Sequence, residues 1–306
     1  MKLKGIILTM LSAIAFGFGF TLGPMTYGSG GSNPATLTFL RNILSLPFLL
    51  GLIYLNKIDL RVSKQQLKSL IILAVLGNTT TTLLLNTSFA YIDVGVATSI
   101  QFTYPIFVTL GCVLLFHEKL TRQKFLSLFI CMSGIALFFT EAYKSSSFDS
   151  DSILGLFLAL ATGIFYSFYM IYMDKTGLKS EAPLKVTFYI AIVSSVSTFL
   201  YGLFTNQLLI FSLTAKSWMI SFIFAVLCNI IALTLIQVGI KHIGPSTAAV
   251  ISTFEPITSV IFGVILLNEK VTLIKIIACI LIIAGVLVLS YNKKIKHIDP
   301  VPENEL

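Results

Sequence analysis

The chain alternates between long apolar runs and short polar connections. A transmembrane helix needs roughly 20 consecutive apolar residues, and ten runs of about this length occur in the sequence. They fall at residues 5–27, 34–55, 67–91, 95–116, 122–141, 153–173, 184–205, 217–240, 244–267 and 272–291. Pro34, Pro183 and Pro245 lie in first turns, where a missing N–H breaks no helical hydrogen bond. The pattern predicts ten transmembrane helices, with antiparallel neighbours wherever the connections are short.

Composition places this pattern in a membrane. Hydrophobic residues make up 56% of the 306 residues and charged residues only 11%, and the mean hydropathy is +0.93. Soluble proteins carry about 25% charged residues, so we predict an all-α integral membrane protein without a large extramembrane domain. Because the cysteines all lie in apolar runs without metal-binding spacing, we expect no metal or cofactor. They are Cys112, Cys131, Cys228 and Cys279.

The positive charges predict the orientation. The net charge of +8 would suggest nucleic acid in a soluble protein, but here the Lys and Arg residues flank the apolar runs, so we expect no nucleic-acid partner. If both termini face the cytoplasm, the inner segments hold 16 Lys and Arg residues and the outer segments hold 4. The positive-inside rule therefore favours a multi-pass protein of the cell membrane with both termini in the cytoplasm.

The two halves of the chain repeat. Residues 104–121 read YPIFVTLGCVLLFHEKLT and residues 255–272 read EPITSVIFGVILLNEKVT. A constant offset of 151 pairs Pro105 with Pro256 and Glu118 with Glu269. We predict two five-helix units, at 1–145 and 150–292, followed by a cytoplasmic tail at 293–306. Five is an odd number, so the second unit must be inverted relative to the first, as in secondary transporters, whose substrate sites lie near the midplane.

These motifs resemble the drug/metabolite transporter superfamily, in its EamA-type branch of ten-helix carriers. The resemblance rests on Pro105…Glu118-Lys-Leu-Thr121 and Glu255-Pro256…Glu269-Lys-Val-Thr272, together with Arg41 and the glycine of each half's last helix, Gly134 and Gly285. It covers nearly the whole chain. It implies alternating access, a central cavity lined by helices 1, 3, 4, 6, 8 and 9, and often export of amino acids or related metabolites.

Glu255 is the sharpest candidate for a role in transport. It lies near the middle of run 244–267, where a carboxylate costs roughly 2.5–3.5 kcal/mol on insertion scales. An apolar environment disfavours the charged form, so Glu255 is a candidate to bind a substrate cation or to carry a coupling proton. The structural alternative is a hydrogen-bonded carboxyl group that holds its helix in place. Its counterpart in the first half is the uncharged Tyr104.

Other polar residues are expected at a similar depth. Asn78, Asn229 and Tyr104 lie near mid-span, and Thr82 follows Asn78 by one turn. Amides at this depth suit recognition of amino or carboxyl groups, although interhelical hydrogen bonding is an equal alternative.

Four further residues are candidates for the walls and the mouth of the cavity. Gln101 precedes Tyr104 by one turn. Tyr166 and Tyr169 share a helical face, which fits a cavity wall or a packed core. Arg41 is expected to snorkel outward, to pair within the bundle or to attract an anion at the outer mouth.

Glu118 and Glu269 end their spans beside a lysine. We expect them to tie the following turns and to stabilise the next helix N-terminus, although these turns could also act as hinges. We group them with Arg41, Pro105 and Pro256 as structural or gating residues.

The sequence thus predicts a carrier for a small molecule. No ATP-binding loop is present, so gradients would supply the energy. Export of a small polar metabolite, with amino acids first, is the leading function, and uptake or exchange of another metabolite, proton-coupled through Glu255, is the alternative. An enzyme is not expected, because the histidines lie at span ends or in the tail. We expect the protein to contact membrane lipid and a small-molecule substrate, and to be a monomer or homodimer.

Overall fold

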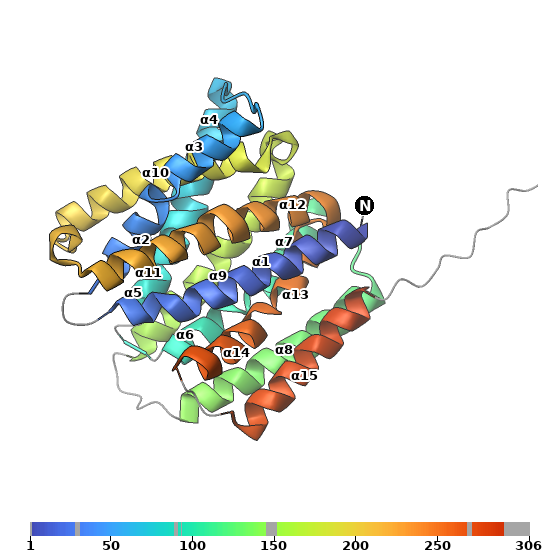
Figure 1. Cartoon of the computed structure of the whole chain (residues 1–306). Coiled ribbons are helices and arrows are strands. Elements are labelled where there is room, and N and C mark those ends of the chain that lie inside the picture. Colours follow the sequence, from blue (N-terminus) through green and yellow to red (C-terminus); the bar gives the residue numbers. More distant parts are fainter. Residues whose placement is uncertain are drawn as a thin grey trace, which may run out of the picture.

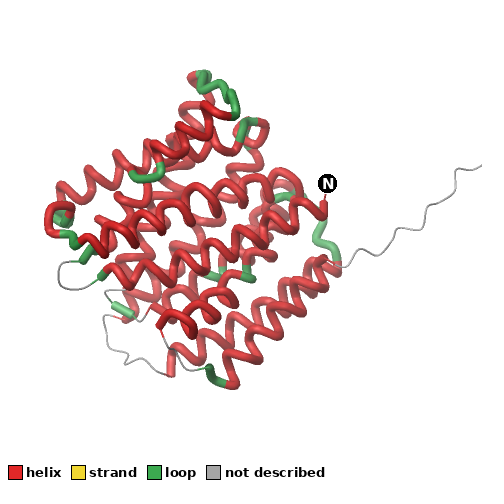
Figure 2. Tube along the Cα trace, in the orientation of Figure 1, coloured by secondary structure: helices red, strands yellow, loops and turns green. Residues whose placement is uncertain are grey.

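Helices form the regular structure of this chain in its computed structural model, which describes residues 2–27, 31–88, 91–92, 94–144, 152–267 and 271–290. In Figures 1 and 2 they pack side by side into one bundle. The first half contains α1 (Lys2–Leu22), η1 (Gly23–Thr26), α2 (Pro34–Ile43), α3 (Leu46–Leu55), α4 (Lys64–Ile72), η2 (Leu73–Thr79), α5 (Thr80–Ser88), α6 (Val94–Gln101), α7 (Tyr104–Phe116) and α8 (Arg122–Lys144). The second half contains α9 (Ser152–Lys175), η3 (Gly177–Ser180), α10 (Pro183–Phe204), η4 (Ile210–Ser212), α11 (Ala215–Ala225), η5 (Val226–Ala232), α12 (Leu233–Ile243), α13 (Pro245–Ser252), α14 (Glu255–Leu267) and α15 (Leu273–Ser290).

These elements form the predicted spans. Among the described residues, nine helical stretches are long and apolar enough to cross a membrane, and the shorter apolar helix Leu273–Leu289 supplies the tenth run. Large apolar side chains remain exposed on the outside of the bundle, including Phe129, Phe157 and Phe204 at 63%, 68% and 81%. Exposed apolar surface on this scale is typical of a lipid-facing protein. The prediction of an all-α membrane protein with ten transmembrane helices is confirmed.

Two of the predicted spans are broken at positions related by the duplication. The run 95–116 divides into α6 and α7 at residues 102–103, and the run 244–267 divides into α13 and α14 at residues 253–254. Pro105 and Pro256 are the second residues of α7 and α14. Because proline lacks an N–H and its ring collides with the preceding turn, a new helix begins here. The apolar pattern predicts one continuous helix for each run, so the two breaks are a correction.

The third and eighth spans contain the other irregularity. In span Lys64–Ser88 the π-helical segment η2 separates α4 from α5, and in span Ala215–Ile243 the π-helical segment η5 separates α11 from α12. Asn78 lies in η2 and Asn229 in η5. π-Helical turns inside α-helices often mark functional sites, and these two widen the helices where the polar side chains project.

Helix α1 lies between α12 and α14 (Figure 1). Gly17 makes this packing possible, because a Cβ atom there would lie 2.7 Å from the backbone oxygen of Glu255 and closer still to Oγ1 of Thr258. The Oγ of Ser259 also donates to the backbone oxygen of Gly17, at 3.3 Å. Gly17 therefore sets how closely α1 approaches the start of α14.

Helices α8 and α15, the last of each half, pack along one another at the edge of the bundle (Figure 1). A Cβ atom on Gly134 would lie 2.8 Å from the Ala278 oxygen, and one on Gly285 would lie 3.0 Å from the Ser127 oxygen. Ser127 donates to the Gly285 oxygen at 2.6 Å. The glycine of each half's last helix thus allows close contact between these two helices.

Candidate functional site

A cavity of about 740 Å³ lies in the centre of the bundle. Its lining comes from both halves, and nine of its residues are aromatic. These are Phe16, Phe20, Tyr27, Phe102, Tyr104, Phe138, Tyr166, Tyr169 and Phe224. The volume falls within the roughly 300–1,000 Å³ range of small-molecule sites.

The cavity extends toward one end of the bundle. Tyr27, after η1, and Thr272 and Lys275, at the start of α15, belong to its lining. This end is opposite the one at which α1 begins and α15 finishes (Figure 1). The connections at the latter end, 117–121 and 176–182, contribute no residue to the lining. Among the described residues, the cavity therefore reaches one end of the bundle and stops short of the other.

An arginine and a glutamate lie in the cavity wall. The side chains of Arg41 on α2 and Glu255 at the start of α14 both line it, and these residues are 4% and 7% exposed. The Nε of Arg41 donates to Oδ1 of Asn229 at 2.8 Å, and its guanidinium lies 5.8 Å from the ring centre of Phe224. Arg41 is thus held within the bundle, which is one of the three alternatives predicted from the sequence.

Asn229 was predicted to line the cavity, and it does not. It is fully buried and absent from the lining. Its Nδ2 lies 3.0 Å from the backbone oxygen of Arg41, 2.9 Å from Oδ1 of Asn42 and 3.3 Å from Oγ of Ser45. The physical reason for the correction is that α2 covers this part of η5, so Asn229 bonds to α2 and fixes Arg41.

Asn78, its counterpart in the first half, does line the cavity. Its Nδ2 donates to Oγ of Ser194 on α10 at 3.0 Å. Thr82 and Gln101 line the cavity as well, and the Thr82 hydroxyl donates to the Asn78 backbone oxygen at 2.8 Å. Of the residues related by the duplication, one amide faces the cavity and the other supports an arginine.

Three tyrosines form a continuous aromatic wall. The rings of Tyr104 and Tyr166 are perpendicular at 4.8 Å, and those of Tyr166 and Tyr169 are parallel at 5.9 Å. Gln237 donates from Nε2 to the Tyr169 hydroxyl at 3.1 Å. All three tyrosines line the cavity, as does Pro256, whereas Pro105 is buried outside its lining.

Several functional neighbours were missed in the sequence. Phe16 and Phe20 stack at 5.7 Å on the cavity face of α1, and Gln237 supports Tyr169. The spacing of four between the two phenylalanines was a usable signal, since such residues share a helical face. Gln237 gave a weaker signal, because a polar residue near a span end is common.

Charged groups join the helices at the other end of the bundle. The Nζ of Lys175, the last residue of α9, lies 3.0 Å from Oε1 of Glu118, which follows α7, and the Nζ of Lys124 on α8 lies 4.0 Å from Oε2 of Glu118. Asp174 pairs with Lys179 within the same region. Glu118 thus ties the turn after α7 to α8, as expected, and also reaches α9. Glu269 lies outside the described residues.

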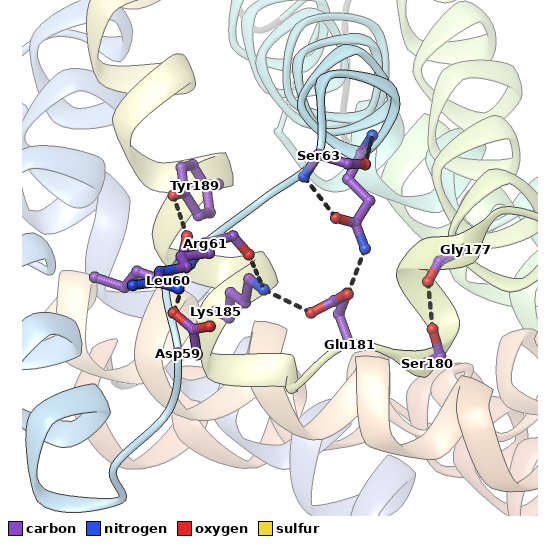
Figure 3. Close-up of polar contacts among 10 residues, drawn as sticks. Asp59, Leu60, Arg61, Ser63, Gly177, Ser180, Glu181, Lys185 and Tyr189 are labelled. Carbon is purple, nitrogen blue, oxygen red and sulfur yellow. Dashed lines mark hydrogen bonds and ion pairs between the residues drawn. The ribbon is translucent and has the colours of Figure 1, made fainter.

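A second polar network fastens the same end (Figure 3). The Nζ of Lys185 donates to the Arg61 backbone oxygen at 2.6 Å and pairs with Oε2 of Glu181 at 2.8 Å. Glu181 also accepts from Gln66 on α4, and the Tyr189 hydroxyl donates to the Leu60 oxygen at 2.6 Å. These contacts hold segment 57–66 against the start of α10. Within the described residues, no group of three or more His, Cys, Asp or Glu side chains could hold a metal ion.

Comparison with known proteins agrees with this arrangement. Residues 3–140 and 153–291 match the profile of the EamA-like transporter family. The chain is 24% identical over 292 residues to "Uncharacterized transporter YoaV" of Bacillus subtilis (strain 168), a match covering 90% of this chain and 93% of that protein. It is 26% identical over 210 residues to "Uncharacterized transporter sll1319" of Synechocystis sp. (strain ATCC 27184 / PCC 6803 / Kazusa), covering 69% of this chain and 63% of that relative's length. A solved crystal structure shares the fold, with a TM-score of 0.81 at 15% identity over 94% of this chain and 96% of the other.

Proposed function

Because this chain belongs to the EamA-like transporter family, we propose that it is a secondary carrier that exports a small polar metabolite, with amino acids first, by alternating access. The observation that carries the proposal is the deep cavity, which reaches one end of the bundle and places Arg41 and Glu255 in its wall. Placement in the cell membrane with both termini in the cytoplasm completes it.

The shape of the cavity supports alternating access. A carrier must expose its site to one side at a time, and discontinuous helices commonly build such sites. Here α6/α7 and α13/α14 are broken at matching positions beside the cavity, and the ion pairs around Glu118 link helices at the opposite end, which the cavity does not reach. In the proposed orientation, the cavity extends toward the outside and the cytoplasmic end is closed.

The chemistry of the cavity supports a small polar substrate. An amino acid carries a carboxylate, an ammonium group and a side chain, and the cavity wall offers a guanidinium, a carboxylate and aromatic rings. Asn78, Thr82 and Gln101 add neutral hydrogen-bonding groups.

Proton-coupled uptake or exchange through Glu255 is the second candidate. It is favoured by one observation, which is that no ion pair within 4.0 Å involves Glu255 among the described residues. An uncompensated carboxyl group in an apolar site is able to exchange a proton.

Reconstituted proteoliposomes would test both candidates. The proteoliposomes are loaded with a panel of radiolabelled amino acids, and flux is recorded with and without a pH gradient. Liposomes without protein are the control. Export predicts that an amino acid moves down its own concentration gradient. Proton coupling predicts that an amino acid accumulates against its concentration gradient, that this accumulation depends on the pH gradient, and that it is lost in Glu255→Gln. Absence of flux for every amino acid in the panel would contradict the proposed function.

A further inference from the structure

Arg41 and Glu255 face one cavity from different halves of the chain. Both lie in its lining with little exposure, and they are too far apart to count as an ion pair within 4.0 Å. Tyr166 lies in the same wall. A buried charge without a partner is unfavourable in a membrane, so a ligand that brings a carboxylate to Arg41 and a cationic group to Glu255 would be favoured in this cavity.

The guanidinium of Arg41 is held in a defined orientation. Its Nε is committed to Asn229, and the ring of Phe224 lies against it. Asn229 is in turn fixed by bonds to the Arg41 backbone, Asn42 and Ser45. No hydrogen bond joins the two terminal nitrogens of Arg41 to another described residue. A guanidinium held in this way is suited to bind a carboxylate through two parallel hydrogen bonds.

Glu255 offers the complementary group. Its carboxylate accepts no hydrogen bond from the described residues, whereas its backbone oxygen accepts one from Thr258. The aromatic wall beside it, which includes Tyr104 and Tyr166, adds ring faces that attract cations.

We infer that the cavity recognises a zwitterion at two points, with Arg41 binding the carboxylate and Glu255 the ammonium group. Asn229 is the positioning residue that orients Arg41. This inference rests on the proposed function and gives it a basis for selectivity. A molecule with one charge leaves either Arg41 or Glu255 unpaired, so it binds less tightly than a zwitterion of the same size.

Matched ligands that differ only in charge would test the inference. Leucine is compared with 3-methylbutylamine, which lacks the carboxylate, and with 4-methylpentanoate, which lacks the amine. Phenylalanine, phenethylamine and 3-phenylpropanoate form a second set with an aromatic body. Apparent affinities come from inhibition of amino-acid flux in proteoliposomes and from thermal shifts of the purified protein. We expect the single-charge analogues to bind roughly 10- to 100-fold more weakly, the range for a hydrogen-bonded charge.

Variants assign each end of the ligand to a residue. Arg41→Gln should weaken the zwitterion and the acid while leaving the amine unaffected, and Glu255→Gln should weaken the zwitterion and the amine while leaving the acid unaffected. Asn229→Leu should follow the Arg41→Gln pattern in KM, with a smaller change in kcat. Arg61→Gln is the matched control, since its side chain is exposed and lies outside the cavity lining.

Each outcome decides between the two proposals. If the zwitterion binds no more tightly than the amine, or no more tightly than the acid, the two-point inference is overturned. The proposed function still stands in that case, provided that an amino acid is transported. An equal loss for all three ligands in both charge variants overturns the two-point inference too. Flux of no amino acid overturns the proposed function and the inference with it. If Asn229→Leu fails to fold, the Arg41 and Glu255 variants still decide the matter.

Discussion

The Nε of Arg41 and the Oδ1 of Asn229, 2.8 Å apart, join the first half of the chain to the second at the cavity wall. Arg41 belongs to α2 and Asn229 to the π-helical segment η5. The bond uses the one guanidinium nitrogen that is not part of the terminal fork. It therefore connects the two halves without occupying the two terminal nitrogens of Arg41.

Asn229→Leu should destabilise the protein. The change removes the amide that bonds to Arg41, Asn42 and Ser45, and it leaves buried polar groups without partners. Such losses cost about 1–3 kcal/mol, which should lower the thermal midpoint of the detergent-solubilised protein by several degrees. Asn56→Ala, at an exposed asparagine, is the control and should change the midpoint little. A midpoint for Asn229→Leu equal to that of the wild type would refute the supporting role.

Gly17→Ala should also destabilise the protein and reduce transport. The new methyl group would collide with Oγ1 of Thr258 and lie 2.7 Å from the Glu255 backbone oxygen, so α1 and α14 must separate. Overpacking of this kind costs about 1–3 kcal/mol. Gly51→Ala is the matched control, because nothing lies within 4 Å of its Cβ position. Thermal unfolding and flux are measured for both, and a similar result for the two variants would be evidence against close packing at Gly17.

The periodicity of the chain predicted the spans well because lipid requires long apolar helices. The same periodicity could not show that spans 95–116 and 244–267 break at their centres, since residues 102–103 and 253–254 are not exceptional in polarity. Pro105 and Pro256 marked these places, but a proline in an apolar run is compatible with either a kink or a break. The backbone hydrogen bonds that decide between a kink and a break depend on neighbouring helices.

The site was predictable in depth but not in role. The duplication placed Asn78, Tyr104 and Glu255 at a common level, and all three line the cavity. It placed Asn229 there as well, yet that amide bonds to α2. The packing angle and the π-helical turn decide which side of a helix contacts its neighbour. The constant offset between the two repeats predicts neither of them.

Reporter fusions should place both ends of the chain in the cytoplasm. The expectation follows from the 16 inner and 4 outer Lys and Arg residues. A fluorescent protein that folds only in the cytoplasm should fluoresce when fused after Leu306, and alkaline phosphatase fused there should be inactive. The opposite pair of results is expected for fusions after Asn206, between α10 and η4. Active phosphatase at Leu306 would reverse the orientation and, with it, the side to which the cavity extends.

Glu118→Gln should favour opening of the closed end. The carboxylate links the turn after α7 to Lys175 on α9, and the two side chains are 31% and 27% exposed. Partly exposed pairs contribute about 0.2–1 kcal/mol, which corresponds to a shift of roughly 1.5- to 5-fold between closed and open populations. Labelling by an impermeant maleimide should therefore become faster at Met173→Cys, a buried position near this end, and slower at Val260→Cys in the cavity, with the four native cysteines replaced.

Lys179→Gln separates a link between spans from a general effect of charge. Lys179 pairs with Asp174, and both belong to the region from the end of α9 to η3, so this pair does not join α9 to α7. Its removal should leave both labelling rates near those of the parent protein. If Lys179→Gln and Glu118→Gln speed labelling at position 173 equally, charge in the cluster matters but the contact between α7 and α9 does not. If only Glu118→Gln does so, and the rate at position 260 falls, one ion pair biases the two ends in opposite directions, which is what alternating access requires.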